Sequence, residues 1–160
     1  LDFIAHLKSV SKILMDGGLY YMIIPDKRYC FDYYMAESTI AEVLSSHFNK
    51  KEAHSLKSVI EHIALTTHNQ AKKHWNNNHG SLENVELRIE KAIKEYEVAN
   101  GKNIDVHAWY FTPKSFATLI TMLNSLNFID LEVKKITSTS YGKHEFYVVL
   151  RHNRTKSIVN

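Results

Sequence analysis

The sequence predicts an α/β fold in a single domain of 160 residues, and three observations support this prediction. An amphipathic pattern opens the chain and leads through two glycines into an unbroken apolar run. The middle of the chain has only helical periodicity, and its C-terminal third returns to a helix followed by two β-rich runs. We expect three parts and a tail, at residues 1–35, 36–100, 101–151 and 152–160.

The first part is predicted to be a helix followed by a strand. Over residues 2–15 the apolar side chains recur at three- and four-residue intervals, which places them on one helix face. The turn Asp16 to Gly18 ends this helix, because glycine tolerates the left-handed backbone that often follows a helix. The run Leu19–Ile24 then shows no polar alternation, which predicts a strand buried on both faces, with Tyr20 and Tyr21 in the core.

The middle part is predicted to be three helices. Apolar residues with helical spacing place them at residues 38–48, 55–71 and 82–98, and an Asn-Gly pair closes the third. His68 and Asn69 fall at the end of the second helix. There they either point toward a pocket or cap the helix.

The last part is predicted to be a helix and an antiparallel strand pair. Thr112, followed by proline, is a typical helix N-cap, and the helical pattern continues to Leu126. Two β-rich runs, residues 129–137 and 145–150, are joined by a short polar link that contains glycine. The polar residues after the last run, Arg151 to Asn160, are expected to form a tail.

Composition excludes several classes of protein. Apolar residues make up 44% of the chain and charged residues 23%, so it is not a disordered or low-complexity protein. A net charge of +3 gives no argument for nucleic-acid binding, and no apolar run is long enough to span a membrane. The single cysteine, Cys30, excludes a disulfide framework; we expect it to be buried and inert, in a cytoplasmic setting. Leu1 stands where an initiator Met is usual, and the helical pattern begins within a few residues, which suggests that an upstream segment is missing.

Six of the ten histidines crowd the middle part: His47, His54, His62, His68, His74 and His79. No two histidines in the chain are three or four residues apart, the spacing that puts two imidazoles on one helix face to hold zinc. We therefore expect surface or hydrogen-bonded histidines and no metal site, although a cluster formed by the tertiary structure stays open.

The loop after the first strand is the expected mouth of a binding site, because ligands of open α/β sheets bind beyond the carboxyl ends of the strands. Asp26, Arg28, Tyr29 and Asp32 combine charge and aromatic character there, which suits a small hydroxylated substrate. The alternative is a solvated loop with its aromatic side chains packed beneath it.

Several stretches resemble the C-terminal half of a class I S-adenosylmethionine-dependent methyltransferase. Residues 7–25 resemble the family's helix, "lkPGG" turn and fifth strand, although Asp16 stands where proline is usual. Thr112 to Phe116, with Leu123 and Phe128, resembles the next helix, and the final strand pair resembles strands six and seven. Two aromatic blocks, Asp26–Asp32 and Asp105–Pro113, resemble a narrower bacterial subgroup of methyltransferase-domain proteins.

The resemblance implies a partial Rossmann-like sheet of strands 5, 6 and 7 with a three-helix insertion. It implies methyl transfer from S-adenosylmethionine to a small polar acceptor. His107 would accept the acceptor's proton, and the substrate-binding set would be Asp26, Arg28, Tyr29, Asp32, His68, Trp109 and Tyr110. A structural histidine hydrogen-bonded to its loop is the alternative role for His107. The family's glycine-rich cofactor loop has no counterpart here, so we expect no cofactor-binding residues and no activity from this segment alone.

Two further expectations follow from the resemblance. In that family the fifth strand lies between the fourth and the seventh, and the fourth has no counterpart here. The free edge of residues 19–24 would then pair with a second copy or a partner chain, be covered by a rearranged segment, or be bare because upstream residues are missing.

The alternative function is a non-catalytic binding or interaction module that keeps the methyltransferase fold.

Overall fold

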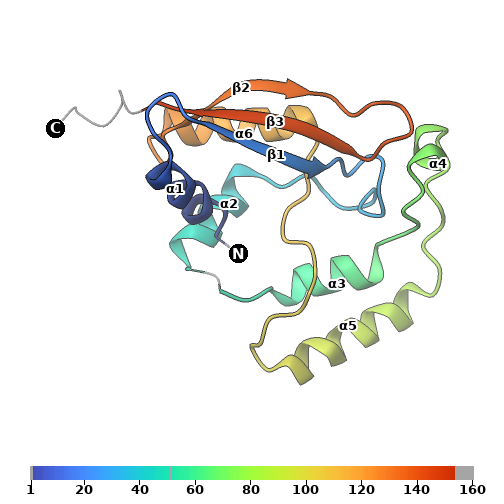
Figure 1. Cartoon of the computed structure of the whole chain (residues 1–160). Helices are drawn as coiled ribbons and strands as arrows, with labels where there is room; N and C mark the ends of the chain where they lie inside the picture. The colour runs from blue at the N-terminus through green and yellow to red at the C-terminus, as the bar shows by residue number, and fades with distance from the viewer. Residues whose placement is uncertain (1, 51, 154–160) are drawn as a thin grey trace.

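A computed structural model describes residues 2–50 and 52–153. This part of the chain has a mixed α/β architecture of six helices and one three-stranded antiparallel sheet (Figure 1). In chain order the elements are α1 Phe3–Ile13, β1 Leu19–Pro25, α2 Ile40–Phe48, α3 Leu56–Ala64, α4 Ala71–Trp75, α5 Val85–Ala99, α6 Pro113–Ser125, β2 Leu131–Thr137 and β3 Glu145–His152.

The sheet has the strand order β1-β3-β2, with β3 antiparallel to both neighbours. The predicted pairing of the last two strands is confirmed, and β1 joins the other side of β3, with Ile23 opposite Tyr147. The central strand is longer than predicted. Arg151 and His152, expected in the tail, pair with β1 and β2 instead; the tail from residue 154 onward lies outside the described residues.

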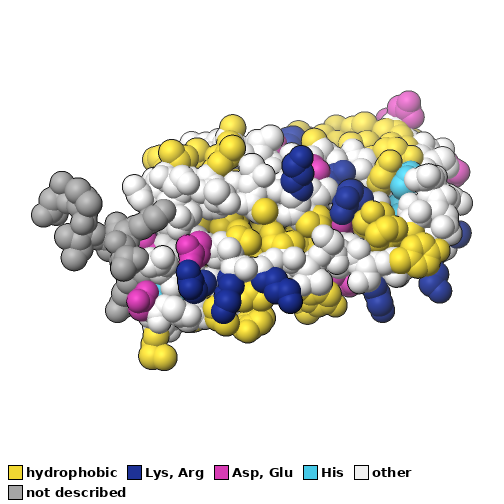
Figure 2. Space-filling view, turned by 90° about the horizontal axis from the view of Figure 1, so that it is seen from above, with side chains coloured by type: hydrophobic (Ala, Val, Ile, Leu, Met, Phe, Trp, Pro, Cys, Tyr) yellow, Lys and Arg dark blue, Asp and Glu magenta, His cyan; other side chains and the backbone are white. Residues whose placement is uncertain are grey.

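The prediction that β1 is buried on both faces is wrong. Tyr21 and Ile23 are 69% and 68% exposed, whereas Tyr20, Met22 and Ile24 on the opposite face contact the core. The strand is apolar on both faces, but it pairs with an antiparallel strand and its outer face stays open. Apolar side chains also reach the surface elsewhere, and Figure 2 shows them between lysine and arginine side chains.

The main core lies between the inner face of the sheet and helices α1, α2 and α6. Along β3, fully buried residues alternate with residues that are exposed or partly buried, so every second side chain points into this core. Its largest fully buried side chains include Ile4, Leu7, Phe116, Ile120, Phe146 and Leu150. The helices predicted at residues 2–15 and 112–126 are confirmed, and Thr112 caps α6 as expected, by accepting a hydrogen bond from the Ser115 amide.

Helices α3 and α5 form a second, smaller core around Val59, Ala92 and Val106. The helix predicted over residues 55–71 is wrong in its second half, because α3 ends at Ala64. His68 and Asn69 therefore lie in a loop before the short helix α4, and do not end a helix. The cause is a contact far along the chain: an arginine of α5 binds the carbonyl oxygens at the end of α3.

The second edge of β1 carries no strand in the described chain. At its end a single parallel bridge joins Asp26 to Phe111, which brings the segment before α6 against the loop after β1. Among the described residues, no helix is both long enough and apolar enough to cross a membrane.

Candidate functional site

Three segments meet beyond the carboxyl end of β1. They are the loop that follows β1, the C-terminal half of α3, and residues 104–112, which lead from α5 into α6 (Figure 1). The bridge between Asp26 and Phe111 holds the first and third segments together, and the Thr67 amide donates to the carbonyl oxygen of Phe31 from the chain that follows α3. The site therefore depends on residues that are far apart in the sequence.

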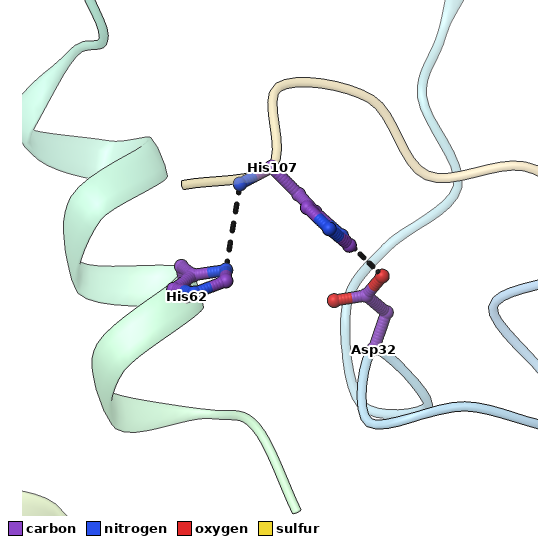
Figure 3. Close-up of side chains that lie close together, drawn as sticks. All are labelled: Asp32, His62 and His107. Carbon is purple, nitrogen blue, oxygen red and sulfur yellow. Dashed lines mark hydrogen bonds and ion pairs between the residues drawn. The ribbon is translucent and has the colours of Figure 1, made fainter. Parts of the chain in front are cut away.

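Asp32 and His107, both predicted site residues, are hydrogen-bonded to each other. Nδ1 of His107 lies 2.8 Å from Oδ2 of Asp32, across 75 positions of sequence (Figure 3). The carboxylate is 2% exposed, whereas the imidazole is 37% exposed. With Nδ1 engaged by the carboxylate, Nε2 is the nitrogen that remains for another partner.

The surroundings raise the pKa values of both side chains that hydrogen-bond to Asp32, His107 and Cys30. The hydrogen bond to Asp32 raises the pKa of His107, and burial only partly opposes this effect. Burial raises the pKa of the Cys30 thiol to about 12, and the Asp32 charge adds to the shift. Cys30 is buried, as expected, and its S–H donates to Oδ2 of Asp32 at 3.7 Å, so it stays a thiol and not a nucleophile.

His62 is the residue that sequence reasoning missed. It projects from α3, and its Nδ1 accepts a hydrogen bond from the His107 backbone amide at 3.4 Å. Phe31 packs against both imidazoles, with ring centroids 5.8 Å from His62 and 5.0 Å from His107. Burial lowers the pKa of His62, which favours the neutral ring that this contact requires. No local spacing could have paired residues 45 positions apart.

A cavity of about 320 Å³ lies next to this group, between α2, α3 and the segment before α6. Trp109 and Tyr110, both predicted substrate-binding residues, line it, and so do five serines from three segments: Ser38, Ser45, Ser46, Ser55 and Ser58. The volume falls in the range of small-molecule sites. His107 is not part of the wall, but Tyr110 connects the two features, because its hydroxyl donates to the His107 carbonyl oxygen at 3.3 Å.

The cavity wall also carries charge and one unused histidine atom. Glu42 and Lys57 form an ion pair across it at 2.8 Å, which holds α2 against α3. His54 also lines the cavity, and its buried Nδ1 has no hydrogen-bond partner among the described residues. A hydroxylated molecule would supply such a partner.

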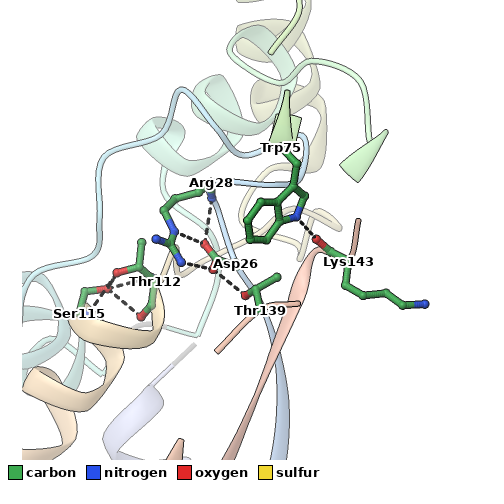
Figure 4. A network of polar contacts seen from close by, with 7 residues as sticks. All are labelled: Asp26, Arg28, Trp75, Thr112, Ser115, Thr139 and Lys143. Carbon is green, nitrogen blue, oxygen red and sulfur yellow. Dashed lines mark hydrogen bonds and ion pairs between the residues drawn. The ribbon is translucent and has the colours of Figure 1, made fainter. Parts of the chain in front are cut away.

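Asp26 and Arg28, also predicted to bind substrate, bind each other in the structure. Asp26 is completely buried, accepts two bonds from the Arg28 guanidinium, at 2.9 and 2.7 Å, and accepts a third from Thr139 at 2.7 Å (Figure 4). Arg28 is bound to this carboxylate and does not reach the cavity between α2 and α3. The pair ties the loop after β1 to the segment after β2.

Tyr29 and His68 lie away from the cavity as well. Tyr29 stacks on Trp75 of α4 with ring centroids 3.8 Å apart, and the indole N–H donates to the Lys143 carbonyl oxygen. His68 belongs to a separate histidine cluster, in which its carbonyl oxygen accepts a hydrogen bond from His74. Of the eight predicted site residues, the structure thus brings together Asp32 with His107 and Trp109 with Tyr110.

The residues present do not fit an S-adenosylmethionine site. Gly17 and Gly18 lie at the opposite end of β1, where Gly17 donates to His152 and Gly18 fits closely against the Met15 carbonyl oxygen. In the described chain the connection from a strand into a helix runs from Pro25 to Ile40 and contains no glycine. The described residues therefore supply no glycine-containing loop between a strand and a helix that could bind this cofactor.

Comparisons with protein-family models, with curated proteins and with solved structures find no match to this chain. Its functional assignment therefore depends on the geometry of the site and on the resemblance carried by its own residues.

Proposed function

We propose that this chain is the acceptor-binding portion of an S-adenosylmethionine-dependent methyltransferase that acts on a small hydroxylated molecule. The observation that carries the proposal is the Asp32–His107 pair beside the serine-lined cavity. A buried carboxylate that fixes one imidazole nitrogen leaves the other oriented to take a proton from a hydroxyl. Methyl transfer to oxygen needs such a base. Beyond that, the protein mainly has to hold the methyl donor and the acceptor close together and correctly oriented.

Two features of the fold support the resemblance behind this proposal. The family's fifth strand pairs with its seventh, and β1 pairs with β3 in the same way. The order helix, glycine turn, β1, insertion, α6, β2 and β3 also follows the family's order of elements. Because the described residues do not fit the cofactor, its site is assigned in this proposal to a segment outside them.

The test uses the protein with any segment that its gene encodes before Leu1. Titration calorimetry with S-adenosylmethionine comes first, followed by an assay for S-adenosylhomocysteine released in the presence of small polyols and sugars. We expect His107→Gln to slow release about 100-fold, the usual contribution of a general base, and to leave cofactor binding unchanged. Gln keeps a donor for Asp32 but cannot accept the proton.

The matched control is His6→Gln, at an exposed histidine of α1 that contacts Tyr20. This variant should keep the full rate. A folded full-length protein that does not bind S-adenosylmethionine would end the methyltransferase proposal. Retained binding of a hydroxylated ligand would then favour a non-catalytic binding module.

A further inference from the structure

Three side chains that could act as metal ligands, Asp32, His62 and His107, lie close together. The proposed function uses Asp32 and His107 but not His62. Asp32 comes from the loop after β1, His62 from α3 and His107 from the segment before α6 (Figure 3). One donor atom from each side chain lies within 4.8 Å of the other two. No other group of this kind occurs in the described part of the chain.

Asp32 has an oxygen atom without a partner. Both neighbouring donors, His107 and Cys30, point to Oδ2, whereas Oδ1 is buried and accepts no hydrogen bond among the described residues. In the view of Figure 3 this oxygen lies on the His62 side of the carboxylate. A carboxylate that is 2% exposed and half unsatisfied is costly to fold. A cation bound between the carboxylate and His62 would remove that cost.

The donor set selects the kind of cation. Two imidazoles and one carboxylate match the ligands of zinc and its first-row neighbours, while calcium and magnesium prefer sites made of oxygen alone. Three protein ligands leave one position open, as in catalytic zinc sites. Zinc–nitrogen bonds of about 2.1 Å place ligand atoms roughly 3 Å apart, so the His62 side chain has to rotate toward Asp32 on binding.

We propose that Asp32, His62 and His107 bind a divalent transition metal of the zinc class. Binding has a consequence for His107. A neutral imidazole has a single lone pair, and coordination uses it whichever nitrogen binds. The metal-bound protein therefore has no base at His107, so metal binding and proton acceptance exclude each other. The metal site itself does not depend on the proposed function.

The test is a calorimetric titration of untagged protein with zinc chloride, without acceptor or cofactor. We expect one zinc ion per chain. His62→Gln should weaken binding at least about 100-fold, because loss of a ligand costs more than the 10- to 100-fold of a lost outer-shell partner. The control, His79→Gln, removes a histidine outside the triad and should leave the affinity unchanged. Cobalt(II) should give the visible absorption of a protein-bound ion, and His62→Gln should abolish it.

Thermal unfolding in excess chelator verifies that each variant is folded, and Asp32→Asn provides a second ligand variant that keeps the size of the side chain. Absence of zinc binding by the parent protein would overturn the inference. Weakening by His79→Gln but not by His62→Gln would also overturn it, since the metal would then be bound by the other histidine cluster, in which His74 contacts His68 and His79. Because no acceptor is present, these outcomes leave the methyltransferase proposal untouched.

Discussion

At the scale of single residues, two aspartates of one loop have different roles because their partners differ. Asp26 is enclosed by Arg28 and Thr139, which satisfy both of its oxygens. Asp32 is equally buried, but its Oδ1 has no hydrogen-bond partner among the described residues. The first carboxylate stabilises the loop, and the second keeps a capacity to bind.

His74 is the residue with the clearest expected effect of pH on stability. It is 1% exposed, and its Nε2 donates to the His68 carbonyl oxygen at 2.9 Å. Nδ1 must therefore accept from Nδ1 of His79, 3.1 Å away. Burial lowers the pKa of His74 below the ordinary 6.5, and burial also lowers that of His79. Protonation of His74 would place a positive charge on a buried side chain, which is unfavourable.

We expect acid to destabilise the protein through this cluster. Because the folded-state pKa lies below 6.5, the stabilisation is present above that pH and is lost as the pH falls toward the lowered value. The measurement is urea unfolding at pH 7.5, 6.5 and 5.5. His74→Gln should reduce the pH dependence, whereas His6→Gln at an exposed site should preserve it. An unchanged pH dependence in His74→Gln would refute the role of this cluster.

At this scale the sequence located the site only in part. The loop Asp26–Asp32 and the block Asp105–Pro113 were predicted to face the site, and one residue from each, Asp32 and His107, meet there. Sequence could not separate Asp32 from Asp26, since the residue that completes the Asp26 network, Thr139, lies 113 positions away. Sequence also could not identify His62, because its partner, the His107 backbone amide, lies 45 positions away.

At the scale of elements, the end of α3 is set by a residue of another helix. Arg88 of α5 donates to the carbonyl oxygens of Ile63 and Thr66 and to the Thr66 hydroxyl. A positive group at a helix C-terminus satisfies carbonyl oxygens that have no partner within the helix, and also favours the helix dipole. Arg88 thus stops α3 and joins the two helices of the insertion.

We expect Arg88→Lys to lower the free energy of unfolding by about 1–2 kcal/mol, because an ammonium group cannot make all three hydrogen bonds with the same geometry. Urea unfolding provides the measurement. Lys91→Arg is the control on the same helix; it keeps an exposed pair with Glu95 and should change stability by less than about 0.5 kcal/mol. Equal effects of the two substitutions would show that the Arg88 contacts are not stabilising.

Most elements were predictable because their signals are local. The N-cap of α6, the glycine turn before β1 and the two C-terminal strands were all expected from adjacent residues. Two of the wrong predictions depended on distant partners. The helical spacing of apolar residues continues past Ala64, although the helix ends there, where Arg88 binds its carbonyl oxygens. The second wrong prediction concerns β1, which is apolar on a face that no described element covers.

At the scale of the whole molecule, the described chain has two cores of unequal size. The main core, between the sheet and helices α1, α2 and α6, includes Val148. The smaller core between α3 and α5 contains only a few buried side chains, among them Val59. Regions with few buried apolar contacts open at lower free energy than the rest of a protein. The helical insertion should therefore open before the sheet does.

A matched pair of substitutions tests this difference. Val59→Ala and Val148→Ala remove the same atoms from sites that are 0% and 1% exposed, and each should cost roughly 2 kcal/mol. In native-state hydrogen exchange, Val59→Ala should reduce protection in α3 and α5 only. Val148→Ala should reduce protection throughout the molecule. A uniform loss in Val59→Ala would show that the two cores unfold as one unit.

The separation of Asp32 and His107 by 75 residues also affects how the protein folds. The sheet and α6 can assemble while the insertion is still an open loop, but the two side chains meet only when that loop has closed. A folding intermediate with a formed sheet and an undocked insertion therefore has neither the hydrogen-bonded pair nor the three-ligand group. The appearance of the site during refolding reports loop closure, a step that the secondary structure signal of the sheet does not detect.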